Sequence, residues 1–375
     1  MSGPLAGTRV IEIGGIGPTP FAGMLLADMG AEVIRVDRPG GSLPLPLPPE
    51  HDLANRGKTM ICLDLKRRDA VEALLQLVAT ADVVVEGFRP GVAERLGIGP
   101  EQCWQLRPAL VYGRMTGWGQ DGLWSQRSGH DANYVGMTGA LHAIGPAGGA
   151  PSVPLNLLGD YGGGSTYLVM GVLAALLRAR EDGTGEVVDA AIVDGVAHLM
   201  SGVHGFAAAG AWTDERESNF FDGGAPFYGV YRTSDDRHMV AAGIEPQFFA
   251  EMCELLEISV PLASLADRRQ WPSVRRLLED AFGSRTQAHW AEVFADSDAC
   301  VTPVLTINES LDDPHLRSRG TYVDGAPAPA PRFQRNPSRL PSTPRRPGVD
   351  TRSFLTAAGL DAEGLLASGA AVQED

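Results

Sequence analysis

The sequence TRVIEIGGIGPTPFAGMLLADMGAEVIRVD, residues 8–37, decides the fold. The β-branched run 8–13 predicts a strand, the apolar segment 21–29 predicts a helix, and residues 32–37 predict a second strand. Because a helix joins the two strands, the stretch predicts one parallel strand-helix-strand unit.

The same alternation continues outward from this unit. Residues 60–63, 82–86 and 110–114 predict three more strands, and residues 68–80 predict an amphipathic helix. The segment SLPLPLPP, residues 42–49, predicts a loop or flap because its prolines remove backbone donors. The pattern therefore predicts an α/β fold with a doubly wound, Rossmann-like, mostly parallel sheet, and ligands beyond the carboxyl ends of its strands.

The rest of the chain predicts a second, smaller α/β domain. We expect a central helix over 162–180, a strand over 186–191 and a long helix over 192–215. The pattern then predicts a hairpin at 229–232 and 238–242 and helices at 246–257 and 271–282. We expect an extended strap over the seven prolines of 326–347. The expected domains are a large domain (1–190), linker helices (191–225), a small domain (226–318), and a return strap with a C-terminal segment that packs on the large domain (319–375).

Composition excludes several classes of protein. A chain of 375 residues is long enough for two to three domains with a substantial core. Its longest unbroken apolar run, residues 167–177, is much shorter than the roughly 20 residues of a membrane-spanning helix, so we expect no membrane insertion. The formal net charge is −15 and there is no long basic run, which argues against a nucleic-acid partner.

The four cysteines predict a reducing compartment. Cys62, Cys103, Cys253 and Cys300 lie far apart and form no C-x-x-C pair, so we expect buried thiols and neither a zinc ribbon nor a redox motif. The start of the chain lacks the features of a signal peptide, which favours the cytoplasm. Lysine occurs only at positions 58 and 66, and the arginine-rich composition is typical of a GC-rich bacterial genome.

The first candidate site is the turn from Gly15 to Pro20, with Asp37 at the end of the following strand. The spacing mimics a dinucleotide fingerprint, in which glycines admit a pyrophosphate and the acid binds a ribose hydroxyl. The third glycine is missing, and two prolines remove donors that would bind phosphate. We therefore favour a tight strand-to-helix turn near an active site.

Six cations on the predicted sheet form the second candidate. Several of them lie at strand ends beside Gly or Pro, where a ligand would bind, although each one alone is more typical of a solvated surface. A group of this kind suits phosphate contact; its members are Arg35, Arg38, Arg56, Lys58, Arg89 and Arg95.

The third candidate joins residues 129–134, GHDANY, to residues 154–165, PLNLLGDYGGGS. Asp160 stands just before a glycine-rich helix start, where backbone N–H groups favour negative charge. A simple helix cap explains this acid equally well. Three consecutive glycines are costly in a helix, however, unless something approaches the backbone closely, and an anionic carbonyl is one possibility. His130 alone is more typical of a structural histidine, with Asp131 as an orienting partner or a turn residue.

Glu245 is the fourth candidate, at the exit of an apolar strand in the predicted small domain. A first-turn helix acid ahead of Pro246 explains it as well as a functional role does.

Together these segments resemble CoA-transferase family III, and within it the α-methylacyl-CoA racemases. The blocks occur in family order along most of the chain: GTRVIEIGGIGP, LLADMGAEVIRVDRPGG, NRGKTMICLDLK, DVVVEGFRPGVAERLGIGP, GHDANYVGMTGAL, LLGDYGGGS, GVLAALLRAREDGTGEVVDAAIVDG and GIEPQFF. The resemblance implies a two-domain subunit and an interlocked homodimer, with active sites between the large domain of one subunit and the small domain of the other.

The resemblance also indicates which chemistry to expect. Transferases of the family use the aspartate matching Asp160 as a nucleophile and generally lack a histidine at the position of His130. This chain has the histidine, and Ile244-Glu245-Pro246-Gln247 stands where transferases carry a glycine-rich loop. The resemblance thus implies an isomerase that racemises 2-methylacyl-CoA thioesters at C2, without metal or separate cofactor, because CoA is part of the substrate.

Racemisation requires a proton to leave one face of the α-carbon and another to arrive on the opposite face, through an enolate. We assign His130 to the (S) face and Asp160 to the (R) face, alternating as acid and base, with Glu245 orienting His130. Backbone N–H groups of Asp160, Tyr161 and Gly162 are the expected donors to the enolate oxygen. By the same resemblance, CoA and the thioester are expected to contact Arg38, Asn55, Arg56, Lys58, Gly87, Phe88, Arg89, Arg95, Gly129, Asp131, Asn133 and Tyr134.

Two alternatives remain open from the sequence. A family III CoA-transferase would form a thioester on Asp160, and an acyl-CoA-binding protein would keep the fold without the chemistry. The presence of His130, Asp160 and Glu245 together favours the racemase.

Overall fold

The computed structural model describes residues 2–41, 47–338 and 342–374. Its contacts divide the chain into two compact units, which we describe separately. The first comprises Met1–Thr138, Pro154–Leu199 and Ala326–Asp375, and the second comprises Gly139–Val153 and Met200–Gly325. Residues expected to form a linker are thus divided between the units at Leu199.

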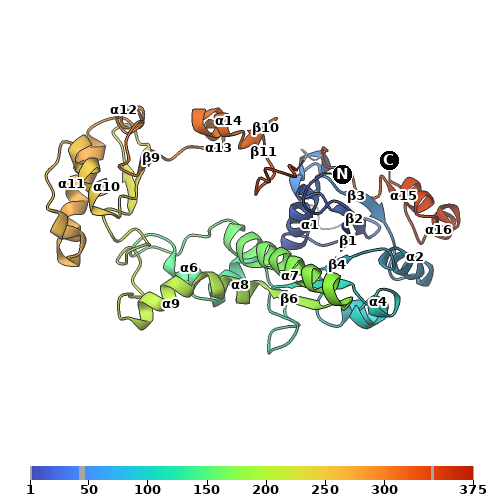
Figure 1. The fold of residues 1–375 in the computed structure, drawn as a ribbon. Coiled ribbons are helices and arrows are strands. Elements are labelled where there is room, and N and C mark those ends of the chain that lie inside the picture. The colour runs from blue at the N-terminus through green and yellow to red at the C-terminus, as the bar shows by residue number, and fades with distance from the viewer. Residues whose placement is uncertain (1, 42–46, 339–341, 375) are drawn as a thin grey trace. The chain divides into compact units, whose positions relative to one another are not determined.

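The first unit contains a six-stranded, fully parallel sheet (Figure 1). The strand order is β3-β2-β1-β4-β5-β6, which is the doubly wound order of dinucleotide-binding folds and confirms the predicted sheet. Every expected strand forms, with ends shifted by no more than two residues. The strands are β1 (Arg9–Ile13), β2 (Glu32–Asp37), β3 (Thr59–Cys62), β4 (Val83–Glu86), β5 (Val111–Thr116) and β6 (Val187–Ala191).

Helices cover both faces of this sheet, as a parallel sheet requires. Alternate side chains such as Ile11, Ile34 and Val84 join a core with the amphipathic helix α2 (Arg68–Val78) and with C-terminal residues including Leu355. On the other face lie α1 (Pro18–Asp28) and α7 (Thr166–Asp182) (Figure 1). The unit also contains α3 (Val92–Leu96), α4 (Pro100–Leu106), α5 (Asp131–Met137), α8 (Ile192–Leu199), α15 (Thr351–Ala357), α16 (Ala362–Ser368) and the short 3-10 turns η1 (Pro49–His51) and η2 (Leu53–Asn55).

Three helix predictions need correction. Helix α1 begins at Pro18, before the expected residue 21, because prolines suit a first turn whose N–H groups have no helical acceptor. The central helix begins earlier too, as a π-helical segment η3 (Leu157–Ser165) that continues into α7. The long helix expected over 192–215 is two helices, α8 and α9 (Ser201–Ala208), and Gly210 adopts a left-handed φ of 68° soon after α9.

The second unit has an antiparallel sheet in the order β7-β8-β9, so the expected hairpin is present. Its core is rich in aromatic side chains, including Phe227, Tyr231, Phe249 and Phe282. The strands are β7 (Gly229–Arg232), β8 (His238–Ala241) and β9 (Val301–Pro303). The helices are α6 (Ala140–Ala143), α10 (Pro246–Leu255), α11 (Trp271–Gly283), α12 (Gln287–Val293), α13 (Ile307–Asp312), α14 (Pro314–Arg319), η4 (Leu262–Leu265) and η5 (Arg268–Gln270). The short strand β10 (Tyr322–Val323) follows in this unit, and β11 (Ala326–Pro327) begins the last segment of the first unit.

Residues 42–46 of the expected proline loop and residues 339–341 of the expected strap lie outside the described residues. Within the described part of 326–347, only β11 has regular structure. Cys62, Cys103 and Cys253 are buried free thiols, whereas Cys300 is exposed, contrary to expectation; it lies just before β9 with a positive φ of 56°.

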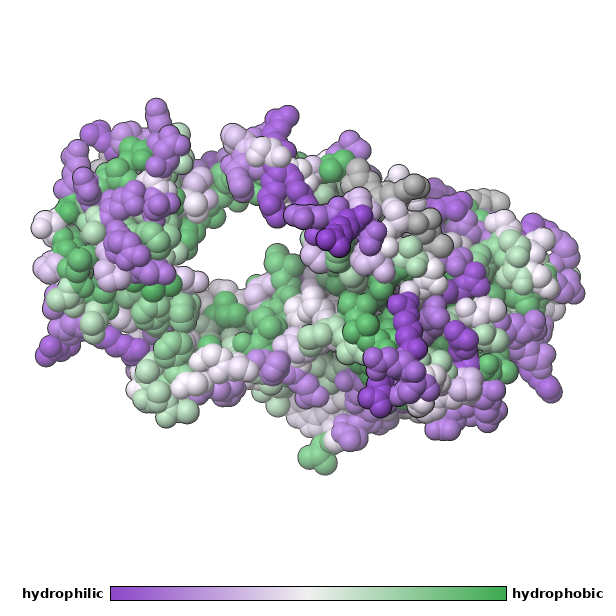
Figure 2. Space-filling view, viewed as in Figure 1, coloured by the Kyte–Doolittle hydropathy of each residue, from purple (hydrophilic) through white to green (hydrophobic). Residues whose placement is uncertain are grey.

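The continuous helical stretch Leu157–Asp182 is long and apolar enough to cross a membrane by length and composition alone. Its helix α7 packs against β5 and β6, which is typical of a core helix of an α/β sheet. Its outer side exposes Met170 and Leu177, whose exposed fractions are 58% and 69%, and the surface over α7 in Figure 2 includes hydrophobic residues.

Candidate active site

A cavity of about 860 Å³ lies at the carboxyl ends of the parallel strands in the first unit. The residue that follows each of the six strands lines it: Gly14, Arg38, Leu63, Gly87, Gly117 and Ile192. This is the position at which a doubly wound sheet binds its ligand. The cavity is therefore the candidate active site.

His130 and Asp160 both line this cavity, although they come from different elements. His130 is the exposed residue that precedes α5, and Asp160 lies in the middle of η3. Short π-helical segments frequently occur at functional sites. Of the other residues expected from the sequence, those that line the cavity are Arg38, Gly87, Phe88, Arg89, Gly129 and Tyr134.

The environment of Asp160 suits proton transfer near neutral pH. Burial, together with the negative charge of Asp131, raises the pKa of its carboxyl to about 6, against the opposing effects of a hydrogen bond from Asn156 and the charge of His130. A carboxyl group with such a pKa exchanges protons readily at physiological pH.

Asp131 and Asn133 do not line the cavity, but each accepts a hydrogen bond from the backbone of a residue that does. Asp131 is buried, and its Oδ2 accepts the backbone N–H of Asp160 at 2.7 Å. The Oδ1 atom of Asn133 accepts the backbone N–H of His130 at 3.0 Å, in the manner of half a capping box. Both residues were expected to contact substrate, but neither lines the cavity, and the hydrogen bonds indicate positioning roles.

The same hydrogen bonds correct the expected oxyanion donors. The N–H of Asp160 already donates to Asp131, and the N–H of Tyr161 donates to the carbonyl of Asn156 at 3.3 Å. The Tyr161 ring stacks on Phe21 of α1, with ring centroids 4.1 Å apart. Gly162 lies within the π-helical segment. Because both N–H groups already have acceptors within the fold, Asp160 and Tyr161 are not available as donors to an enolate in this geometry.

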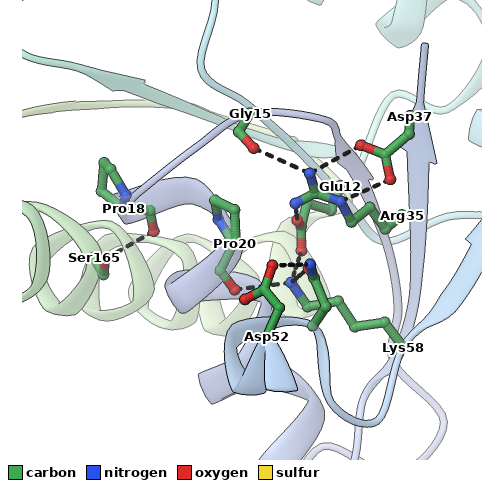
Figure 3. Close-up of polar contacts among 10 residues, drawn as sticks. Glu12, Gly15, Pro18, Pro20, Arg35, Asp37, Asp52, Lys58 and Ser165 are labelled. Carbon is green, nitrogen blue, oxygen red and sulfur yellow. Dashed lines mark hydrogen bonds and ion pairs between the residues drawn. The ribbon is translucent and has the colours of Figure 1, made fainter. Parts of the chain in front are cut away.

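The glycines after Asp160 make room for neighbouring helices. A Cβ on Gly163 would lie 2.8 Å from the backbone nitrogen of Val196 in α8, and one on Gly164 would lie 3.3 Å from Cβ of Pro18. Ser165 then joins η3 to α1, because its hydroxyl donates to the carbonyl of Pro18 at 2.7 Å (Figure 3). At Gly163 and Gly164, the close approach inferred from GGG is thus made by neighbouring segments of the chain itself.

Lys58 and Arg56, expected to contact phosphates, are turned into the protein. Lys58 is 4% exposed, and its Nζ lies 2.6 Å from Oε2 of Glu12 and donates to the carbonyl of Pro20 at 2.8 Å. Burial lowers the pKa of Lys58, and the opposite charge of Glu12 counteracts this effect. Arg56 is likewise buried and paired with Asp28 at 2.5 Å, and Asn55 is buried. None of the three lines the cavity, so the structure does not place them where the expected phosphate contacts would form. Lys58 and Arg56 have carboxylate partners inside the fold, as buried charges require. Arg95 also does not line the cavity.

Arg35 joins this buried network and ties it to the turn after β1 (Figure 3). Its guanidinium donates to Glu12 at 2.6 Å, to both oxygens of Asp37 at 2.9 Å, and to the carbonyl of Gly15 at 3.0 Å. Asp37 is therefore paired with Arg35 and is not free to bind a ribose hydroxyl, as a dinucleotide-binding site would require.

Two cations of the cavity were not among the expected site residues. Lys66, an exposed residue after β3, and Arg127, in the segment between β5 and α5, line the cavity together with Arg38 and Arg89. The rule that ligands bind beyond the ends of parallel strands could have indicated Lys66. Nothing local distinguishes Arg127 from an ordinary surface arginine.

Glu245 belongs to the second unit, where it directly precedes Pro246 at the start of α10. Its position relative to His130 therefore remains a prediction.

Comparison with known proteins identifies the family. The family model of CoA-transferase family III matches residues 5–350. The chain belongs to CoA-transferase family III. This family III chain is 43% identical over 351 residues to alpha-methylacyl-CoA racemase of Mus musculus, covering 92% of the chain and 90% of the mouse protein. It is 38% identical over 369 residues to the Homo sapiens protein of the same name, covering 96% and 94%.

More distant family members include the human succinyl-CoA:glutarate CoA-transferase, 26% identical over 360 residues, with 88% of this chain and 81% of that protein covered. Among solved structures, Rv3272 of Mycobacterium tuberculosis superposes with a TM-score of 0.80 at 27% identity, covering 94% of this family III chain and 99% of that one. A CAIB/BAIF family protein from Brucella suis superposes with a TM-score of 0.82 at 24% identity, covering 96% and 100%, and supports the fold alone.

Proposed function

We propose that this protein racemises 2-methylacyl-CoA thioesters at C2 by 1,1-proton transfer through an enolate. The observation that carries the proposal is that His130 and Asp160 line one cavity, with burial raising the pKa of Asp160 to about 6. The similarity to alpha-methylacyl-CoA racemases along nearly the whole chain supports the same reaction.

The chemistry needs two groups in complementary protonation states on opposite faces of the α-carbon. With the (R) substrate, the Asp160 carboxylate removes the α-proton, and protonated His130 returns a proton to the other face. With the (S) substrate the roles reverse. A carboxyl and an imidazole can share one proton in this way, whereas two ionised carboxylates would repel. The raised pKa of Asp160 brings its affinity for the proton closer to that of an imidazole.

We further propose that the active enzyme is a homodimer in which Glu245 of a second copy orients His130 and stabilises its imidazolium. Exposed apolar side chains support an interface on the first unit; they are Met137, Leu157, Met170, Leu177 and Leu199. Surface of this kind is more typical of a protein contact than of a free helix.

A CoA-transferase reaction is the second candidate. It is favoured by the placement of Asp160 in the cavity and by the family's transferase members. Here the Asp160 carboxylate would attack the thioester carbonyl and form an anhydride, from which CoA thiolate would then produce an enzyme thioester and release the first acid. His130 would have no required proton-transfer role in this reaction.

The decisive experiment is incubation with (R)- or (S)-2-methylacyl-CoA in D2O, measuring α-deuterium and configuration for wild type, His130→Ala and Asp160→Ala. We expect deuterium uptake with inversion by wild type and a loss of at least about a hundredfold in each variant. No uptake by wild type, together with a trapped thioester on Asp160 and acyl transfer to a free acid, would replace the racemase by the transferase.

A further inference from the structure

The segment between β5 and α5 forms one wall of the candidate active site. Trp118, Ser125, Arg127 and Ser128 of this segment line the cavity. We propose that Arg127 binds a phosphate group of the CoA moiety, and that Trp124 and Ser128 hold the arginines that form this anion site. The inference rests on the proposed function and adds a specificity determinant: the enzyme distinguishes CoA thioesters from thioesters that lack the nucleotide.

Arg127 is held in place by an aromatic cluster. Its guanidinium lies 4.5 Å from the centre of the Trp124 ring, and its backbone N–H donates to the carbonyl of Trp124 at 2.8 Å. Trp124 packs edge-on against Trp118 at 4.9 Å, and Trp118 packs against the buried Tyr134 of α5 at 4.7 Å. Stacking on a ring covers one face of a guanidinium and leaves its N–H edge free to donate.

A second arginine, Arg89, lines the same cavity and is hydrogen-bonded to the residue after Arg127. The Nη2 atom of Arg89, from the loop after β4, donates to the hydroxyl of Ser128 at 2.5 Å. The side chain of Gln126 donates to the carbonyl of Pro90 at 3.2 Å, so two hydrogen bonds join the segments. The residues on either side of Arg127 are thus fastened to the loop that carries Arg89.

The charges in the cavity favour a phosphate at this place. Across the described residues, no ion pair within 4.0 Å joins a carboxylate to Arg89 or Arg127. Of the two acids that line the cavity, Asp37 is neutralised by Arg35, and Asp160 is the proposed catalytic group. Two guanidinium groups without carboxylate partners suit a phosphate, which accepts several N–H donors at once. In a 2-methylacyl-CoA only the CoA moiety carries such a group.

An interaction with this part of the substrate should act on binding and not on chemistry. It is made equally in the ground state and the transition state, so its loss raises KM and leaves kcat unchanged. A thioester of pantetheine, which has the reacting carbon but no phosphate, should be insensitive to Arg127.

The test compares Arg127→Ala and Arg127→Lys with Arg68→Ala. Arg68 is a matched control because it is an exposed arginine on α2, paired with Glu72, outside the cavity lining. CoA binding is measured by calorimetry at low and high salt, and α-proton exchange is measured with 2-methylacyl-CoA and 2-methylacyl-pantetheine. For Arg127→Ala we expect about fivefold to twentyfold weaker CoA binding and a smaller salt dependence, with partial recovery in Arg127→Lys.

The pantetheine ester should react equally in wild type and Arg127→Ala. Equal CoA affinity of Arg127→Ala and Arg68→Ala, or an equal loss with both thioesters, would overturn the assignment of Arg127. If wild type binds CoA but exchanges no α-proton, the racemase reaction fails, and the calorimetry still decides the phosphate contact.

Discussion

Gly17 lies so close to Asp160 that a Cβ atom at Gly17 would stand 2.6 Å from Oδ2 of the carboxylate. Gly17 has a left-handed φ of 65° at the start of α1, and Asp160 comes from η3. The turn between β1 and α1 therefore packs directly against Asp160, the proposed acid-base group. A side chain at position 17 would displace the Asp160 carboxylate.

Gly17→Ala should reduce α-proton exchange at least about tenfold, because its methyl group would move the Asp160 carboxylate away from the substrate. Gly7→Ala is the control, since Gly7 also has a positive φ, 87°, but open space around it. Both variants place an alanine at a positive φ, which strains the backbone. Equal exchange rates in the two variants, in the D2O assay, would show that Gly17 matters only for backbone strain.

The rate with the (R) substrate should rise with pH through an apparent pKa of about 6, because Asp160 must be ionised to act as base. Asp131→Asn should move this midpoint to lower pH, since it removes the charge that raises the pKa of Asp160 but keeps an oxygen for the Asp160 N–H. The profile of kcat/KM against pH for both proteins provides the measurement. An unchanged midpoint in Asp131→Asn would argue against this electrostatic coupling.

Asp160 should also lower the stability of the fold at neutral pH. The pKa of Asp160 is raised from the ordinary aspartate value of 3.8 to about 6 in the folded state. The folded chain therefore binds more protons than the unfolded chain between these values, and it loses stability as pH rises through them. Asp160→Asn should therefore raise Tm at pH 7, with a smaller gain near pH 4. Asp182→Asn is a control whose effect on Tm at pH 7 should have the opposite sign. Pairing with Arg178 lowers the pKa of the exposed Asp182 carboxyl, so this carboxylate stabilises the fold and its loss should lower Tm.

The two lysines of the chain should respond differently to replacement by methionine. Lys58→Met leaves Glu12 buried with a lost partner, which should cost about 3–5 kcal/mol of unfolding free energy. Lys66→Met should leave stability nearly unchanged and weaken CoA binding, because Lys66 is exposed and lines the cavity. Urea unfolding and CoA calorimetry separate the two effects. Weaker CoA binding by a stably folded Lys58→Met, with Lys66→Met unaffected, would restore the original assignment of Lys58 as a phosphate ligand.

Gly163→Ala should destabilise the first unit by about 1–3 kcal/mol, because the methyl group would clash with Val196 of α8. Gly202→Ala is the control in a helix, at a position with open space, and should gain about 0.5–1 kcal/mol from higher helix propensity. Thermal unfolding measures whether each substitution lowers or raises the stability. A stabilised Gly163→Ala would show that α8 can move away from η3 at little cost.

Local patterns were sufficient for the sheet and for the region of the site. The β-branched runs of β1 and β2, the helix between them and the prolines that follow are short-range signals, and they predicted a parallel α/β unit with its ligand beyond the strand ends. The order of the motifs was sufficient to indicate the family. The prediction of the sheet depends on residues that are close in sequence. The indication of the family depends on short motifs, each of which is recognisable by itself.

Only the tertiary structure decided what individual side chains do. Lys58 and Lys66 are the same residue type, yet Lys58 is buried in an ion pair with Glu12 and Lys66 lines the cavity. The glycines after Asp160 resemble a ligand-binding turn, but they accommodate α1 and α8. Two of the three N–H groups assigned to an enolate, those of Asp160 and Tyr161, donate to Asp131 and Asn156 instead. The physical reason is common to all three: burial and hydrogen-bond partners are set by segments far apart in the chain, and these meet only when the fold is formed.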